Sequence, residues 1–237
     1  MIALEPDEQS IADLIALLEE GTTPEEIRQA LALAKGFDEE ELADVETLRS
    51  RIRERLDARE DRQRSLARTT ETALGELVEH FGGHIDEQGA ITLPDELLFE
   101  QGDAIITGRL DEFLQEACQP WFEALQSLPF DIHEIRVEGH ASSEWGSGTT
   151  DETAYFNNLS LSQQRASAVL RACLRHTGAN EIGTWARSRT VAVGHSSSRP
   201  IRDASGEEDP ARSRRVVFAA TTRPGDILDE IDAAITD

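Results

Sequence analysis

Residues 135–166 read IRVEGHASSEWGSGTTDETAYFNNLSLSQQRA, and this stretch decides the fold. Its first residues alternate between apolar and charged side chains, with Ile135 and Val137 on one face. This period of two is typical of a strand that buries one face. The alternation stops at Gly139-His140, where a segment rich in Gly, Ser and Thr begins. The pattern predicts a strand followed by a long polar loop over residues 142–157.

A helix is expected to follow this loop. Ser160 has Gln163 three residues later, which is the spacing of a capping box at a helix start. Downstream, apolar residues recur at intervals of three and four, and this spacing places them on one helix face. They are Ala166, Val169, Leu170, Cys173 and Leu174. Arg165 lies on the flank of that face, so we expect a fixed cation near the mouth of the loop.

These residues resemble the central motifs of the OmpA-like domain, a peptidoglycan-binding module of bacterial envelope proteins. The family pattern is a strand ending in Gly-His-Thr-Asp and a helix opened by Asn-x-x-Leu-Ser-x-x-Arg-Ala. Gly139-His140 matches the first part, with Ala141 and Ser142 in place of Thr and Asp. The second part is matched in full by Asn158, Leu161, Ser162, Arg165 and Ala166.

Three further blocks follow in the order of the family. Residues 97–102, LLFEQG, resemble its first-strand Leu-Phe-x-x-Gly. Residues 193–201, VGHSSSRPI, resemble its Gly-x-Gly…Pro-Ile loop, with His195 where a small residue is usual. Residues 213–218, SRRVVF, resemble its Asn-Arg-Arg-Val-Glu strand. The resemblance therefore extends from about Ile91 to Ala220.

The resemblance implies an α+β fold of the βαβαβ type, with helices packed on a mixed sheet. Helical periodicity precedes this domain, for instance in a stripe with a three- or four-residue step that runs from Leu42 to Leu56. The expected organisation is a helical N-terminal region at 1–82, which serves as a stalk or interaction module. The OmpA-like domain follows at 83–222, and an acidic tail helix at 223–237.

The resemblance also implies a ligand and a site. In the family, the loop and helix start bind the carboxylate and amine of diaminopimelate in the stem peptide of peptidoglycan. The corresponding residues here are Gly139, His140, Ser142, Asn158, Leu161, Ser162 and Arg165. A guanidinium suits a carboxylate because it can hold both oxygens. Ser142 replaces the carboxylate for the amine, so Glu144 or Asp151 is a candidate substitute. No enzymatic activity and no cofactor are implied.

Several of these residues also have purely structural interpretations. Arg165 can form a salt bridge to a neighbouring acid, and Asn158 can bond to the loop backbone. Trp145 either stacks on a sugar ring or anchors its loop to the domain. Arg214 and Arg215 are expected to be structural ions at the end of the sheet.

Metal binding and hydrolysis are not expected. His140 and His195 both end predicted strands and can approach each other, with Glu144 near, as metal ligands. No His-x-x-x-His or cysteine spacing supports such a site. Ser142 and Ser143 stand beside His140, but they lack the Gly-x-Ser-x-Gly context of a nucleophile.

The charge of the chain argues against two classes of partner. Twenty-three basic and 47 acidic residues give a net charge of -24 over 237 residues. Nucleic acid and anionic membrane surfaces are therefore not expected partners, because both need a basic face. Cys118 and Cys173 are the only cysteines. We expect two buried, reduced side chains rather than a disulfide.

The family resemblance implies a periplasmic or envelope location, with peptidoglycan as the ligand. The first residues, MIALEPDE, do not have the basic and apolar regions of a signal peptide. No apolar run reaches the roughly 18 residues of a membrane helix. An envelope or stator-like protein is a possible partner of residues 1–82, and a homodimer is also possible. The alternative hypothesis is a cytoplasmic or complex-bound interaction subunit that keeps the fold without binding the wall.

Overall fold

The computed structural model describes residues 45–94, 98–100, 102–146 and 148–222. The chain divides into two compact units, and one of them, Asp61–Arg223, contains the sheet. The helices predicted before residue 45 and the tail helix predicted at 223–237 lie outside the described residues.

Five strands form one mixed sheet in this unit. They are β1 (His84–Ile85), β2 (Ile91–Pro94), β3 (Ile132–His140), β4 (Thr190–Gly194) and β5 (Arg215–Thr222). The strand order is β1-β2-β5-β3-β4. β3 and β4 are parallel, whereas the other neighbouring pairs are antiparallel. The predicted α+β fold with a mixed sheet is confirmed.

The alternating pattern of the central strands explains why they form the sheet. Ile135 and Val137 on β3 are buried, and so are Val216 and Phe218 on β5. Residues two apart on a strand point to the same face, so each strand presents an apolar row to the core. β3 lies between β4 and β5, and its carboxyl end therefore emerges from the middle of the sheet.

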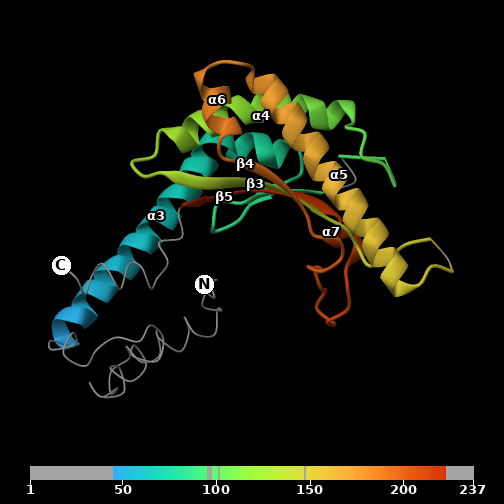
Figure 1. Cartoon of the computed structure of the whole chain (residues 1–237), viewed down its shortest axis with the longest axis horizontal. Helices are drawn as coiled ribbons and strands as arrows, with labels where there is room; N and C mark the ends of the chain where they lie inside the picture. Colours follow the sequence, from blue (N-terminus) through green and yellow to red (C-terminus); the bar gives the residue numbers. More distant parts are fainter. Residues whose placement is uncertain (1–44, 95–97, 101, 147, 223–237) are drawn as a thin grey trace, which may run out of the picture. The chain divides into compact units, whose positions relative to one another are not determined.

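Five helices lie in the described part of the chain. They are α3 (Val45–His80), α4 (Gly108–Gln126), α5 (Asp151–Thr177), α6 (Glu181–Arg187) and α7 (Pro210–Ser213). Figure 1 shows α4, α5 and α6 on one side of the sheet. None of the helices in the described part of the chain combines the length and the apolar character that a membrane crossing requires.

The second half of α3 belongs to the same core. Leu66, Leu74 and Val78 are buried in the cluster that also contains the inner residues of α4 and the sheet. Trp121 on α4 donates a hydrogen bond from Nε1 to Thr70 Oγ1 of α3, at 3.4 Å. The compact unit therefore begins within this helix, at Asp61, and not after it.

α5 begins earlier than the capping pattern predicts. Thr150 is its N-cap and accepts a hydrogen bond from the Thr153 backbone N–H, at 3.3 Å. The prediction of a Ser160 cap is wrong, because Ser160 lies inside the helix and accepts from Gln164 Nε2. The first turns of α5 bury small or polar residues such as Ala154 and Asn158. Hydrophobic periodicity does not detect a buried face of this kind.

The block at residues 97–102 does not form a strand of the sheet in its described part. Phe99 makes only an isolated antiparallel bridge with Ile106. Both Leu98 and Phe99 are buried. Their apolar character therefore reflects burial in the core, and the hairpin of β1 and β2 supplies the strands that precede α4.

The two cysteines join the two long helices of the domain. Cys118 on α4 and Cys173 on α5 form a disulfide, with a Cα–Cα distance of 5.4 Å. The expectation of two reduced cysteines is wrong. Both residues do lie on buried helix faces, as expected. The two buried faces pack against each other in the fold, and the sequence of each helix alone does not predict this contact.

Candidate functional site

A polar groove opens where β3 ends and α5 begins. Its volume is about 910 Å³. The described residues that line it are Phe99, Gly102, Ala141, Ser142, Glu144, Trp145, Gly146, Asn158, Leu161, Arg165 and Arg214. The charged members are two arginines and one glutamate, so this lining is net positive in a chain of charge -24. Such a lining favours an anionic ligand.

Arg165 is a buried cation at the wall of this groove. Its side chain comes from the buried face of α5 and is 4% exposed. Nε donates to the carbonyl oxygen of Asp103 at 2.8 Å, and Nη2 donates to that of Glu100 at 3.3 Å. The guanidinium also lies over the Phe99 ring, 4.7 Å from its centroid. These contacts fix the orientation of the guanidinium before any ligand arrives.

Asn158 holds the loop that forms the opposite wall. Its Nδ2 donates to the carbonyl oxygens of Ser142 at 3.0 Å and Glu144 at 3.4 Å. The structural interpretation of Asn158, a bond to the loop backbone, is therefore the one observed. Because Asn158 is on α5 and the loop follows β3, these bonds fix the groove between the two elements.

Ser142 stands where the family has a carboxylate, and Arg214 faces it. Arg214 Nη1 lies 3.4 Å from Ser142 Oγ and 3.3 Å from Glu144 Oε2. Arg214 was predicted to be a structural ion, but the structure places it on the groove lining as well. Glu144 is the acidic side chain on this lining, whereas Asp151 is exposed in the first turn of α5.

Gly139 and Ser162 bring the two elements of the site together. A Cβ at Gly139 would collide with the backbone carbonyl of Ser162, so only glycine permits this approach of α5 to β3. Ser162 Oγ accepts from the Ser196 backbone N–H at 3.1 Å and donates to Leu159 O. Neither residue is part of the described groove lining. These two residues therefore hold β3 and α5, which carry the groove, close together.

His140 is likewise behind the groove, in a buried polar cluster. Its Nε2 donates to Glu138 Oε2 at 3.2 Å, and His195 Nε2 lies at the same distance from that oxygen. The two imidazole rings stack with centroids 4.8 Å apart. Arg199 Nη1 lies 3.6 Å from the same carboxylate oxygen. The expected approach of His140 to His195 is thus observed, with Glu138 rather than Glu144 as the nearby acid.

Burial controls the protonation of this cluster. It lowers the pKa of His140 and of His195, against the opposing effect of Glu138. Burial raises the pKa of Glu138, but the hydrogen bond from His140 and the charges of His195 and Arg199 outweigh this effect, so its pKa is lowered. The cluster therefore favours neutral imidazoles around an ionised carboxylate.

Aromatic side chains of the loop after β3 and of the first turns of α5 are partly exposed. Trp145 on the lining is 40% exposed, and Phe156 on α5 is 58% exposed. Tyr155 packs edge-on against Phe156, at a centroid distance of 5.7 Å. A Trp ring that is exposed to this extent is accessible for stacking on a ligand.

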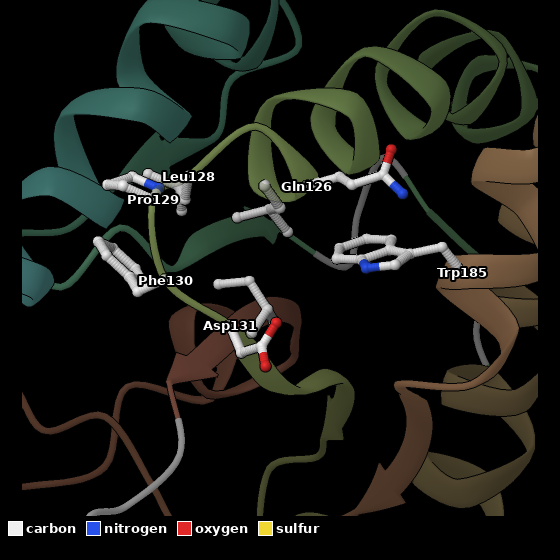
Figure 2. Close-up of a pocket in the computed structure, with 8 residues that line it drawn as sticks. Gln126, Leu128, Pro129, Phe130, Asp131 and Trp185 are labelled. Atoms are coloured by element: carbon white, nitrogen blue, oxygen red, sulfur yellow. The ribbon is translucent and has the colours of Figure 1, made fainter.

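A second hollow lies at the C-terminal end of α4. It has a volume of about 430 Å³ and is lined by the last residues of α4, by the segment that leads from α4 into β3, and by Trp185 of α6. Figure 2 shows these residues, with Asp131 as the acidic side chain among them. The groove is lined by charged side chains of both signs, Glu144, Arg165 and Arg214, whereas this hollow has a single carboxylate. The groove is therefore the stronger candidate for a binding site.

Four of the seven predicted site residues line the groove. They are Ser142, Asn158, Leu161 and Arg165. Gly139, His140 and Ser162 lie behind it, as described above. Sequence reasoning did not assign Arg214 to the site, although its place in the Arg-Arg block beside β5 was recognised.

This combination of fold and groove defines a class of protein. The sequence profile of the OmpA family matches residues 98–214, and the chain belongs to this family. Zorya protein ZorB of Escherichia coli is a relative, with 32% identity over 177 residues that cover 73% of this chain and 75% of ZorB. The uncharacterized protein YtxE of Bacillus subtilis is 29% identical over 55% of this chain and 48% of its own length.

Solved structures show similar domains. The cell wall anchor of the type VI secretion system from Pseudomonas aeruginosa is 20% identical, with a TM-score of 0.44. The alignment covers 64% of this chain and 95% of that one. A putative MotB-like protein from Desulfovibrio vulgaris is 23% identical, with a TM-score of 0.45, over 68% and 99% of the two chains.

Proposed function

We propose that this protein binds the diaminopimelate-containing stem peptide of peptidoglycan in the groove and tethers a cell-envelope component to the wall. The observation that carries the proposal is the convergence of Arg165 and Arg214 on one groove in a strongly acidic chain. A free carboxylate of the peptide binds the guanidinium of Arg165 through charge-assisted hydrogen bonds. The role is binding and anchoring, without enzymatic chemistry.

The fixed position of Arg165 favours such binding. Its contacts with Asp103, Glu100 and Phe99 already hold the guanidinium in place. A preorganised side chain loses little conformational entropy when the ligand arrives. Glu144 takes the amine of diaminopimelate in place of the family's aspartate, because it is the carboxylate on the described lining beside Ser142.

The proposed location is the periplasm or envelope. The disulfide between Cys118 and Cys173 supports this location, because such bonds persist in oxidising compartments and are rare in the cytosol. Membership of the OmpA family points the same way. The partner attached to the wall is proposed to bind through residues 1–82.

The second candidate is an interaction subunit that keeps this fold without binding the wall. Ser142 favours it, because the position that holds a carboxylate in the family is neutral here and faces Arg214. A hydrogen bond that involves an ionised partner is roughly twice as strong as a neutral one. The two candidates differ in whether the groove binds peptidoglycan at all.

Co-sedimentation with diaminopimelate-type sacculi tests the proposal. Arg165→Lys keeps the charge but removes the planar fork of donors, and Arg214→Gln removes a charge from the other wall. Each variant is expected to bind sacculi at least roughly tenfold more weakly than wild type, since hydrogen bonds to charged groups contribute about 1.5–3 kcal/mol. Arg171→Gln, on the exposed surface of the same helix, is the matched control and is expected to bind like wild type.

Thermal unfolding of each variant separates lost binding from lost folding. If folded wild type does not pellet with sacculi at low salt, the wall-binding function is wrong and the interaction subunit remains. If wild type pellets and both groove variants pellet equally well, the function stands but the groove is the wrong site.

A further inference from the structure

Glu138, His140 and His195 form a cluster outside the groove lining, in which Glu138 and His140 are buried and His195 is half-buried. β3 and β4 are parallel neighbours, and Gly139 pairs with Gly194 in their register. The carboxyl ends of two parallel strands meet at one edge of the sheet. His140 ends β3 and His195 directly follows β4, so the topology itself brings the two imidazoles together.

The three side chains bring their possible metal-ligating atoms close together. One oxygen of Glu138, Oε2, lies 3.2 Å from both His140 Nε2 and His195 Nε2. One donor atom from each residue can be chosen so that all three lie within 4.8 Å of one another. Two ligands of a tetrahedral ion with bonds of about 2.0–2.1 Å stand roughly 3.3 Å apart. The Glu–His distances therefore fit around one ion.

The hydrogen bonds of the cluster are incomplete without a further partner. His195 Nε2 is buried and makes no hydrogen bond within the described residues, although it lies near Glu138. Buried nitrogen atoms of this kind are normally satisfied, and an unsatisfied one needs an explanation. A metal ion at the shared oxygen would bind this lone pair and the carboxylate together.

We propose that Glu138, His140 and His195 bind a divalent transition-metal ion of the Zn²⁺ class. Two imidazoles and one carboxylate are a ligand set that suits Zn²⁺, and a fourth position stays open for water. Arg199 Nη1 lies 3.6 Å from Glu138 Oε2, and because this side chain is 58% exposed it can move away from the carboxylate. The ion takes over the place of this guanidinium beside the carboxylate.

A bound ion would fix the ends of β3 and β4 beneath the groove. His140 is followed directly by Ala141 and Ser142, which line the groove. Ala141 N donates to Ser196 O, the residue after His195, at 2.9 Å. The metal thus adds a bond between two segments that already touch. This inference does not depend on peptidoglycan being the ligand of the groove.

Calorimetric titration of the untagged full chain with ZnCl₂ tests the site. We expect about one ion per chain, and a loss of more than about 100-fold in affinity for His195→Ala, because even outer-shell changes cost about 10–100-fold. His133→Ala removes an exposed histidine from the same strand and is expected to bind like wild type. Arg199→Gln removes the competing cation and is expected to bind more tightly.

A second measurement on wild type avoids any dependence on the folding of variants. Nuclear magnetic resonance of the six histidine side chains during the titration should show Zn²⁺-dependent changes centred on His140 and His195. Failure of wild type to bind Zn²⁺, or changes confined to the other histidines, would overturn the proposal. Equal affinities of wild type and folded His195→Ala would also overturn it.

Discussion

At the scale of single residues, Gly139 is a position at the site where the backbone packing requires glycine. An added Cβ would meet the carbonyl group of Ser162, which is backbone and cannot turn away. We expect Gly139→Ala to lower the free energy of unfolding by about 1–3 kcal/mol or more, as overpacking in a core does. Urea denaturation followed by circular dichroism measures this loss.

Gly108→Ala is the matched control for this substitution. A Cβ at Gly108, the first residue of α4, meets no atom within 4 Å. Its effect is expected to stay within about 0.5 kcal/mol. Equal stability of the two variants would show that β3 and α5 do not approach each other as closely as described.

The site residues differ in how far the sequence predicts them. The Arg-Ala motif identifies Arg165, but its contacts with Asp103 and Glu100 join segments more than sixty residues apart. Asn158 was predicted at the site, and only the structure shows that its amide is bonded to the loop. Local sequence can predict the secondary-structure element in which a residue lies. The atoms that its side chain contacts depend on how distant segments of the chain pack.

At the scale of elements, the disulfide connects α4 to α5. The cysteines are 55 residues apart, and the chain-entropy model gives about 4 kcal/mol of stabilisation for a loop of this length. We expect the double variant Cys118→Ala/Cys173→Ala to unfold at lower urea concentration by a corresponding amount. Reduction of wild type should produce a similar loss, while reductant should leave the double variant unchanged. A wild type that is insensitive to reductant would contradict the disulfide.

An ionic contact between the same two helices makes stability depend on pH. The hydrogen bond from His176 lowers the pKa of Asp111, partly offset by burial. A lowered folded pKa means that the ionised carboxylate stabilises the fold above the unfolded value, near 3.9. This contribution is lost as the pH falls through the lower, folded value.

Comparison of wild type with Asp111→Asn isolates this contribution. Wild type is expected to be the more stable protein near neutral pH, and the difference should shrink as the pH falls below about 4. Urea denaturation at a series of pH values measures it. A difference that stays constant over the whole series would show that ionisation of Asp111 does not stabilise the contact.

The element boundaries were harder to predict than the elements. The strands β3 and β5 and the helix α4 follow from clear apolar periodicity. α5 starts ten residues or so before the expected cap, because its first turns bury a polar face toward the loop. The isolated bridge at Phe99 is a related case, in which an apolar run marks burial and not a strand.

At the scale of the whole molecule, the family resemblance predicted the architecture correctly. The motifs around β3, α5, β4 and β5 identified the OmpA fold, whereas the block at 97–102 does not form the strand that the resemblance implies. Composition and periodicity could not reveal the groove itself, because its walls come from α5, from the loop after β3 and from residues near Phe99. Nor could they pair Cys118 with Cys173, since two buried helix faces have many possible neighbours.

The central claim is that the groove recognises the extra carboxylate of diaminopimelate, which lysine lacks. Calorimetry of wild type with a diaminopimelate tripeptide and the matching lysine tripeptide tests it directly. We expect the lysine peptide to bind at least about tenfold more weakly, because one charge-assisted contact to Arg165 is missing. The Arg165→Lys variant should lose most of this preference. Equal affinity of wild type for the two peptides, or no binding of either, would contradict the claim.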